Sequence, residues 1–350
     1  MKKYFVYEIK RNWLTTIVLT AIASAIYLVA AIIMDFSPNM YPIWGGFYYH
    51  SANPTSLIFI PATILIFLCI FVPIHTFAFK TSSRQVDLLY SMPIRREKLY
   101  LVKSLIGLLM VIIPYTIAFW LGFAATAASH QYFNLVGFVP AFFISIPLAI
   151  ALFGFNAFVF TRANRLIDGI IFIAMYSIVV MVIMLFFNEA GYHRPTTFDT
   201  PALFFYYNPY FAFVYLFYNA NTVIRNNVPN SFNWSLFSEI NYGFMGYVYL
   251  SLIGAAAWLA LIFVSPLEKA ENAERISDSI WGYKVLLPIF ISVGLGLTLS
   301  LLWVFIIVAA ISGTVWYIVY KRTAKLKWVD LVSIAGSLLF GGLLSLFIAW

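Results

Sequence analysis

The chain has 350 residues, of which 63% are hydrophobic and only 10% are charged, and its formal net charge is +8. Soluble domains contain about 25% charged residues, so this composition excludes a soluble globular protein. It predicts an all-α polytopic membrane protein. The single cysteine, Cys69, cannot form an intrachain disulfide and is expected to be a small buried apolar residue.

Apolar runs recur along the chain, and a transmembrane helix needs about 20 such residues. We expect helices over residues 13–34, 56–79, 101–128, 135–160, 166–187, 242–264, 285–320 and 331–350. The run over 285–320 is long for one span and short for two. Flanking lysines favour a two-helix hairpin that bends near 301–303, which gives eight to nine transmembrane helices. Because no polar cap follows Trp350, we expect the natural chain to continue.

The lysines and arginines predict the orientation of these spans. With the N-terminus in the cytoplasm, all of the 21 cations except Arg194 and Arg225 fall in cytoplasmic segments. Cytoplasmic loops of membrane proteins carry this excess of positive charge. The bias accounts for the net charge without any nucleic-acid partner.

Residue patterns that carry catalysis or cofactor binding are missing from the sequence. It contains no Walker A motif and no HExxH pair, and its four histidines are not paired at ligand spacing. No charged residue lies well inside a predicted span, Asp168 being at a cytoplasmic edge, whereas ion-coupled carriers usually keep such residues in the membrane. We therefore expect no enzyme, metal site or cofactor in this chain, and any energy must come from a partner.

The cytoplasmic loop over residues 80–103 is dense in charge. Ser82 and Ser83 are good N-cap residues for a short helix over 84–91, which Pro93 ends. Residues 94–103 then restart as a basic amphipathic helix that leads into the third span. The short helix has one apolar face and one polar face. It is either an interfacial helix, with its apolar face in lipid, or a docking element for a soluble partner.

This loop resembles the first cytoplasmic loop of ABC-2-type permeases, the membrane subunits of a class of bacterial ABC exporters. The matching positions are Ser83, Asp87, Leu89, Ser91, Pro93, Ile94, Arg96 and Lys103. The resemblance implies that the loop is a coupling helix that contacts an ATPase subunit. The residues expected at that contact are Arg84, Gln85, Val86, Asp87, Leu88, Leu89, Tyr90, Pro93, Ile94 and Arg96. Val86, Leu89 and Tyr90 are expected to fill a groove on the ATPase.

Residues 1–12 resemble the amphipathic connecting helix of the same family, with Phe5, Ile9 and Trp13 at lipid-facing spacing. The likeness covers about the first 285 residues. Residues 285–350, a hairpin and a last span, resemble only the larger bacterial versions. The whole chain is therefore expected to form one permease domain of a bacterial cytoplasmic membrane.

A second cytoplasmic segment, over residues 265–284, is acidic. Its candidate contact residues are Glu268, Glu271, Glu274 and Arg275. Glu271 and Arg275 have the spacing of an i,i+4 ion pair on a helix. The segment is either a solvated helical turn or a second contact with the ATPase.

A long outer segment, over residues 188–241, has a centre in which half of the residues are Phe or Tyr. This density predicts an interfacial or re-entrant helix broken near Pro209. The segment is either an aromatic belt that caps the helices or an outer gate, with Phe211 and Tyr215 as gate residues.

The resemblance implies a permease subunit that exports an amphipathic or hydrophobic substrate. It would work as a homo- or heterodimer of permeases with separately encoded ABC ATPase subunits, which would hold the ATP and Mg²⁺. Two alternatives remain open at this point: an ATP-independent carrier or channel, and a non-transporting sensor or immunity protein built on the same scaffold.

Overall fold

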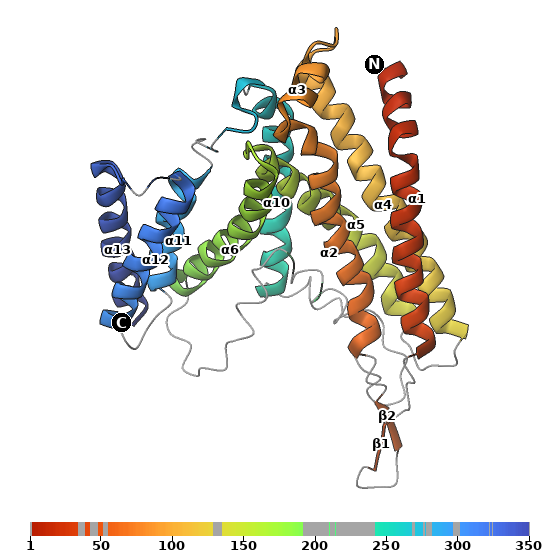
Figure 1. The fold of residues 1–350 in the computed structure, drawn as a ribbon. Helices are drawn as coiled ribbons and strands as arrows, with labels where there is room; N and C mark the ends of the chain where they lie inside the picture. The colour runs from red at the N-terminus through yellow and green to blue at the C-terminus, as the bar shows by residue number, and fades with distance from the viewer. Residues whose placement is uncertain are drawn as a thin grey trace. The chain divides into compact units, whose positions relative to one another are not determined.

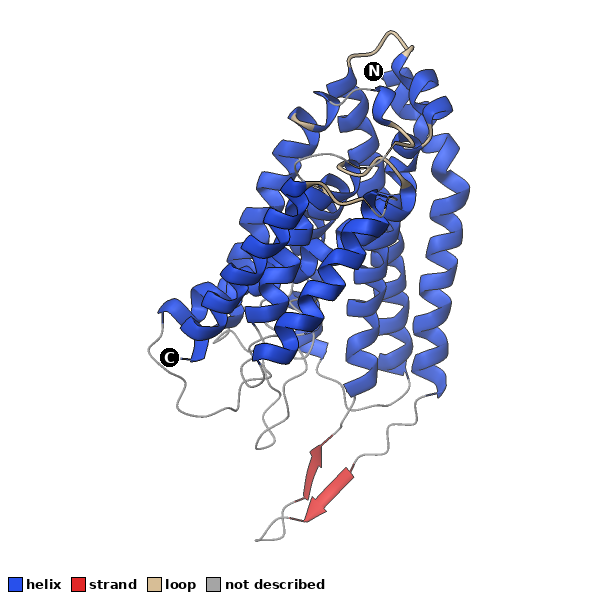
Figure 2. Cartoon of the chain, turned by 60° about the vertical axis from the view of Figure 1, so that its left-hand side comes forward, coloured by secondary structure: helices blue, strands red, loops and turns tan. Residues whose placement is uncertain are grey.

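The chain is almost entirely helical where its structure is described (Figure 2). The computed structural model describes residues 2–33, 39–42, 48–51, 55–128, 135–191, 210, 214, 242–267, 270–275, 277, 282–296, 302–321, 323 and 325–349. Besides the helices, strands β1 (Asn39–Pro42) and β2 (Tyr48–Ser51) pair antiparallel, with Asn39 opposite Ser51. The predicted helical class is confirmed, whereas this hairpin was not predicted.

Within the described residues, five helices are long and apolar enough to cross a membrane. They are α1 (Lys2–Ile33), α2 (Thr55–Phe77), α4 (Arg96–Ala128), α5 (Leu135–Thr161) and α10 (Tyr242–Phe263). Four more helices are apolar but shorter over their described parts: α6 (Leu166–Gly191), α11 (Tyr283–Gly296), α12 (Leu302–Lys321) and α13 (Trp328–Ala349). The chain is therefore a multi-pass membrane protein, and a total of eight to nine spans stays a prediction.

Helix α1 differs from the expected separation of a connecting helix and a first span. It runs without a break from Lys2 to Ile33. Its sequence contains neither proline nor glycine, so no residue in it favours a break or a turn. Residues 2–12 are thus the first turns of one long helix.

The run over 285–320 forms two helices, as predicted. Helix α11 ends at Gly296 and α12 begins at Leu302. The two helices contact each other, and both contact α13. Lys321 at the end of α12 bonds through its Nζ to Oδ1 of Asp330 at 2.6 Å, which fixes the turn into α13.

The chain divides into two compact units. The first unit comprises Met1–Thr76, Pro93–Phe158 and Asn208–Leu267. In it, α1 lies along α4 over most of its length (Figure 1). Many of the buried residues of α1 recur at every fourth position, among them Tyr4, Glu8, Ala23 and Tyr27. This spacing places them on one face of the helix.

Small residues allow close helix packing in the first unit. A Cβ atom built at Gly254 of α10 would lie 2.4 Å from the Cβ of Ala151 in α5. One turn further on, the Trp258 ring lies against Gly154, and its Nε1–H donates to the carbonyl of Ile150 at 2.8 Å. Glycine at these positions lets the two backbones approach, as in other membrane helices.

The second unit comprises Phe77–Met92, Val159–Tyr207 and Glu268–Trp350. Helix α11 lies at its centre and contacts α6, α12 and α13. A Cβ atom at Gly341 of α13 would lie 2.7 Å from the carbonyl oxygen of Ser292 in α11, so this pair of helices is also closely packed. Ser292 donates a hydrogen bond to the Ser337 carbonyl at 3.1 Å.

Candidate functional site

The loop after α2 forms the short helix that the sequence predicts. A 3-10 turn, η1 (Ala78–Thr81), is followed by α3 (Ser83–Tyr90), and the chain leaves the helix at Ser91. Pro93 lies in the break, because it disfavours helical geometry at the residue before it. The next helix, α4, begins at Arg96. The predicted helix and its interruption are confirmed.

The exposure of its side chains shows which face of α3 is covered by the chain and which face is open. Val86 and Leu89 are only 1% and 4% exposed, so the chain itself covers them. In this structure they are not available to fill a groove on a partner, and that part of the prediction is corrected. Helix α3 contacts η1 and a second 3-10 turn, η3 (Ala270–Asn272), both in the same unit. Leu88, which is 66% exposed, is the apolar residue that α3 presents to its surroundings.

The other residues expected at the coupling contact are mostly exposed. Arg84, Gln85 and Asp87 are exposed on α3. Tyr90 is half-buried. In the break that follows, Pro93 and Arg96 are exposed and Ile94 is half-buried. The exposed residues of α3 are therefore polar apart from Leu88.

The N-terminus of α3 is capped by a residue distant in sequence. Ser82 occupies the N-cap position, but its side chain makes no capping bond. The carboxylate oxygen Oε1 of Glu274 instead accepts hydrogen bonds from the backbone N–H of Ser83, at 3.1 Å, and from its hydroxyl, at 3.2 Å. An acidic group at this position satisfies a free N–H and complements the helix dipole.

Glu274 also bonds through its backbone to the turn between α5 and α6. Its N–H donates to the carbonyl of Asn164 at 3.0 Å, and its own carbonyl accepts from Nε of Arg165 at 2.9 Å. Its φ of 64° lies in the left-handed region, which costs a non-glycine residue about 1–2 kcal/mol. These hydrogen bonds offset the strain. We call the three segments that meet at Glu274 the loop junction: residues 82–83, 164–165 and 274–277.

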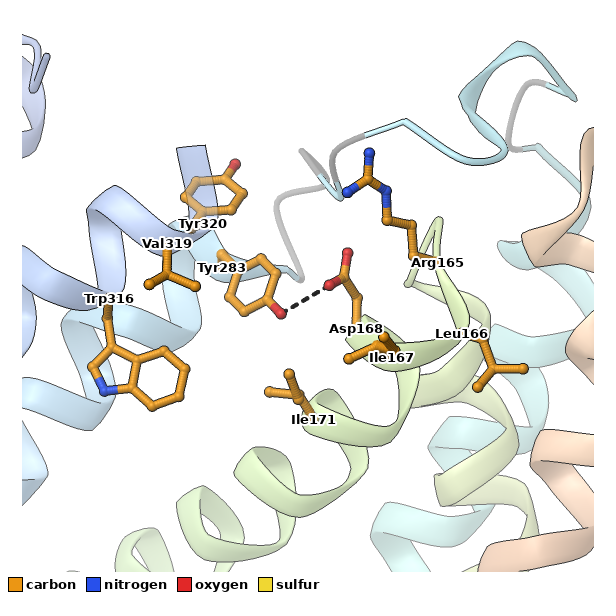
Figure 3. Close-up of a pocket in the computed structure, with 9 residues that line it drawn as sticks. All are labelled: Arg165, Leu166, Ile167, Asp168, Ile171, Tyr283, Trp316, Val319 and Tyr320. Carbon is orange, nitrogen blue, oxygen red and sulfur yellow. Dashed lines mark hydrogen bonds between the residues drawn. The ribbon is translucent and has the colours of Figure 1, made fainter. Parts of the chain in front are cut away.

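Asp168, near the start of α6, extends the loop junction. Ser277 accepts a hydrogen bond from the N–H of Asn164 at 3.0 Å and donates to Oδ2 of Asp168 at 2.6 Å. The Tyr283 hydroxyl donates to Oδ1 of Asp168 at 3.0 Å (Figure 3). Both carboxylate oxygens therefore hold the segment that leads into α11. The sequence predicted no role for Asp168. The feature that could have indicated one is the position of this acidic residue at the edge of an apolar run.

The predicted ion pair between Glu271 and Arg275 is wrong. The segment forms a 3-10 turn at 270–272, and the left-handed Glu274 interrupts any helix that would place these two residues one turn apart. Both side chains are exposed. Glu268 lies outside the described residues. Among the three candidates that the structure describes, Glu274 is the one whose side chain and backbone hydrogen-bond to other loops.

A buried ion pair in the first unit was also missed. Nζ of Lys103 lies 3.2 Å from Oε1 of Glu8, and the side chains are 6% and 2% exposed. The Tyr4 hydroxyl donates to the same oxygen at 2.8 Å. The pair joins the first turns of α1 and α4. Its sequence signal was weak, because Glu8 and Lys103 lie 95 positions apart among other charges.

The candidate outer gate lies outside the described residues, since Pro209, Phe211 and Tyr215 are not among them. Neighbouring Tyr210 is described, and its hydroxyl donates to Oδ1 of Asn156 at 3.1 Å. Asn156 in turn donates to the carbonyl of Cys69 at 2.9 Å. Cys69 is buried, as predicted. Across the described part of the chain, no group of three His, Cys, Asp or Glu side chains is placed to hold a metal ion.

Comparison of the chain with protein-family models, with curated proteins and with solved structures found no match of any of the three kinds.

Proposed function

We propose that the chain is the permease subunit of an ATP-driven exporter of the ABC-2 type. It works with separately encoded ATPase subunits and with a second permease, and α3 is the helix on which the ATPase acts. The observation that carries this proposal is the eight-residue helix α3, which lies in the sequence between two long apolar helices. The exposed face of α3 is polar around one leucine, Leu88. The start of α3 is held by the loop junction.

The exposed surface of α3 suits contact with a soluble protein. A helix held only by lipid would turn its apolar face to the membrane, but Val86 and Leu89 are buried within the chain. What remains outside is Leu88 with Arg84 and Asp87 beside it. An apolar anchor ringed by polar groups is a common arrangement at protein interfaces.

The loop junction offers a route by which force on α3 reaches the membrane. Glu274 connects the start of α3 to the residues that precede α6. Asp168 connects α6 to the residues that precede α11. In this mechanism, displacement of α3 on ATP binding moves α6 and α11 through hydrogen bonds that are already made. The junction also agrees with the charge pattern, because the three loops that meet there are all predicted to be cytoplasmic.

The energy source follows from the sequence. The chain contains no Walker A motif, so the nucleotide would be held by the partner. Amphipathic or hydrophobic compounds are the substrate class that largely apolar spans favour. Within this proposal the chain belongs to the cytoplasmic membrane of a bacterium.

The test is co-expression of the chain with a candidate Walker A ATPase, sought first among the neighbouring genes, followed by affinity purification and measurement of ATP hydrolysis in liposomes. Leu88→Asp and Asp87→Lys should each lower the yield of the complex, because both change the exposed face without touching the buried one. Val329→Asp is the matched control, since Val329 is 74% exposed on α13, outside the proposed contact. It should leave the complex intact.

Two results would contradict the proposal. Normal complex formation by both α3 variants would show that the ATPase does not bind there. Substrate transport by the chain alone, in liposomes without any ATPase, would instead indicate the carrier or channel.

A further inference from the structure

A pocket of about 400 Å³ opens between α6, α11 and α12 of the second unit (Figure 3). Its volume lies within the range of small-molecule sites, about 300–1,000 Å³. Ile167 and Ile171 of α6 and Val319 of α12 provide aliphatic walls. Side chains on both walls are also open to the surroundings, Ile167 being 70% and Val319 61% exposed.

One end of the pocket is anionic and aromatic. Asp168 lines it, together with the rings of Tyr283 and Tyr320, whose centroids lie 4.8 Å apart. Trp316 lines it one helical turn before Tyr320. Asp168 accepts one hydrogen bond on each oxygen, from Ser277 and from Tyr283. An ionised carboxylate has about four acceptor sites, so these two hydrogen bonds leave acceptor capacity unused.

Arg165 is the cation among the residues that line the pocket, and part of its guanidinium is engaged in the loop junction. Its Nε–H donates to the carbonyl of Glu274 at 2.9 Å, in the loop junction. Figure 3 shows its guanidinium extending away from Ile171 and Trp316, beyond Asp168. Going outward from the apolar end, a bound molecule therefore meets aliphatic and indole groups first and the Asp168 carboxylate next.

We propose that this pocket binds a hydrophobic organic cation, an apolar body that carries a single ammonium group at one end. The ammonium lies at Asp168 and against the tyrosine rings, and the body lies along Ile171, Trp316 and Val319. Aromatic rings beside a carboxylate are a favourable environment for a substituted ammonium, which is attracted by both. The inference does not rest on the proposed function, because it concerns binding to this chain alone.

The order of groups in the pocket argues against a phospholipid as the occupant. A phospholipid carries its phosphate between its acyl chains and its amine. With its chains at the apolar end, its phosphate would come next to the Asp168 carboxylate, where like charges repel. A fatty-acid anion would meet the same repulsion. A molecule whose only charge is a terminal ammonium has no such conflict.

The experiment is equilibrium dialysis of the full chain in detergent micelles against labelled octyltrimethylammonium, with empty micelles as the blank. Decanoate, an anion of similar length, and dihexanoyl-phosphatidylethanolamine, a soluble phospholipid, are the comparison probes. We expect saturable binding of the cation and none of the anion. Tighter binding of decanoate, or equal binding of the phospholipid, would overturn the proposal.

Variants locate the site. Trp316→Ala should weaken binding of octyltrimethylammonium about threefold to tenfold, as expected for loss of the apolar contact between the indole and the alkyl chain. Trp328→Ala removes a tryptophan that is 78% exposed on α13, away from the pocket, and should change nothing. Asp168→Asn should weaken binding at least about tenfold; size-exclusion chromatography checks that this variant stays folded. Unchanged affinity in Trp316→Ala would by itself reject this pocket as the site.

Discussion

Removal of the buried charge on Glu8 is the most direct test of how the first unit is held together. Its carboxylate lies 3.2 Å from Nζ of Lys103, and both side chains are almost fully buried. The Tyr4 hydroxyl and the Asn12 amide also donate to it, at 2.8 and 3.3 Å. Arg11 lies 3.7 Å away but is 49% exposed, so solvent screens most of its contribution.

Glu8→Gln keeps the shape of the side chain and an acceptor for Tyr4, but it leaves the Lys103 ammonium buried without its counter-charge. Removing one partner of a buried ion pair costs about 3–5 kcal/mol, because the remaining charge is desolvated and uncompensated. We expect Glu8→Gln and Lys103→Met each to lower the free energy of unfolding by about 3 kcal/mol. The double variant should recover much of this loss, because neither charge then remains.

The assay is SDS titration of the purified protein in mixed micelles, followed by circular dichroism, for the wild type, both single variants and the double variant. Glu97→Gln is the control: Glu97 is exposed in the first turn of α4, and its change should have little effect. If the losses of the two single variants simply add, with a coupling energy below about 0.5 kcal/mol, the ion pair does not join α1 to α4 as described.

Three further predictions concern packing and caps. Gly254→Ala forces apart two backbones and should cost about 1–3 kcal/mol in the same titration, whereas Gly342→Ala, with no atom within 4 Å of its new Cβ, should cost almost nothing; equal losses would contradict the close packing. Glu274→Ala removes the cap of α3, worth about 0.5–2 kcal/mol, so hydrogen exchange over α3 should accelerate, while Glu271→Ala should leave that exchange unchanged. Asp330→Ala removes the carboxylate that accepts a hydrogen bond from the N–H of Lys327, just before α13. Exchange at the start of α13 should therefore rise in the variant, and unaltered rates would show that this cap is not needed.

Local composition was enough to place the helices and the break around Pro93. Apolar runs predicted seven helices to within a few residues, apart from the earlier starts of α1 and α4 and a longer α6. The division of 285–320 into α11 and α12 was also expected. Helix positions depend on the transfer of short segments from water to lipid, and the break depends on the geometry of proline. Both effects are local, because they involve only residues that are close in sequence.

Local sequence could not predict what covers the apolar face of α3. The amphipathic pattern showed that Val86 and Leu89 share a side of the helix, but the pattern is the same whether that side meets a partner, lipid or the chain itself. Burial of 99% and 96% in the structure follows from packing of segments far apart in sequence. Likewise, Ser82 was the expected cap by local rules, yet the bond comes from Glu274, 191 positions beyond Ser83.

The sequence by itself determined that this protein is a helical membrane protein, where its helices lie and which loops carry the positive charge, because each of these depends on the composition of a short segment. Only the tertiary structure decided which polar atoms meet: Glu8 with Lys103, Glu274 with Ser83, and Asp168 with Ser277 and Tyr283. Hydrogen bonds and ion pairs require atoms within about 3–4 Å. For residues on separate helices, that closeness is created by packing.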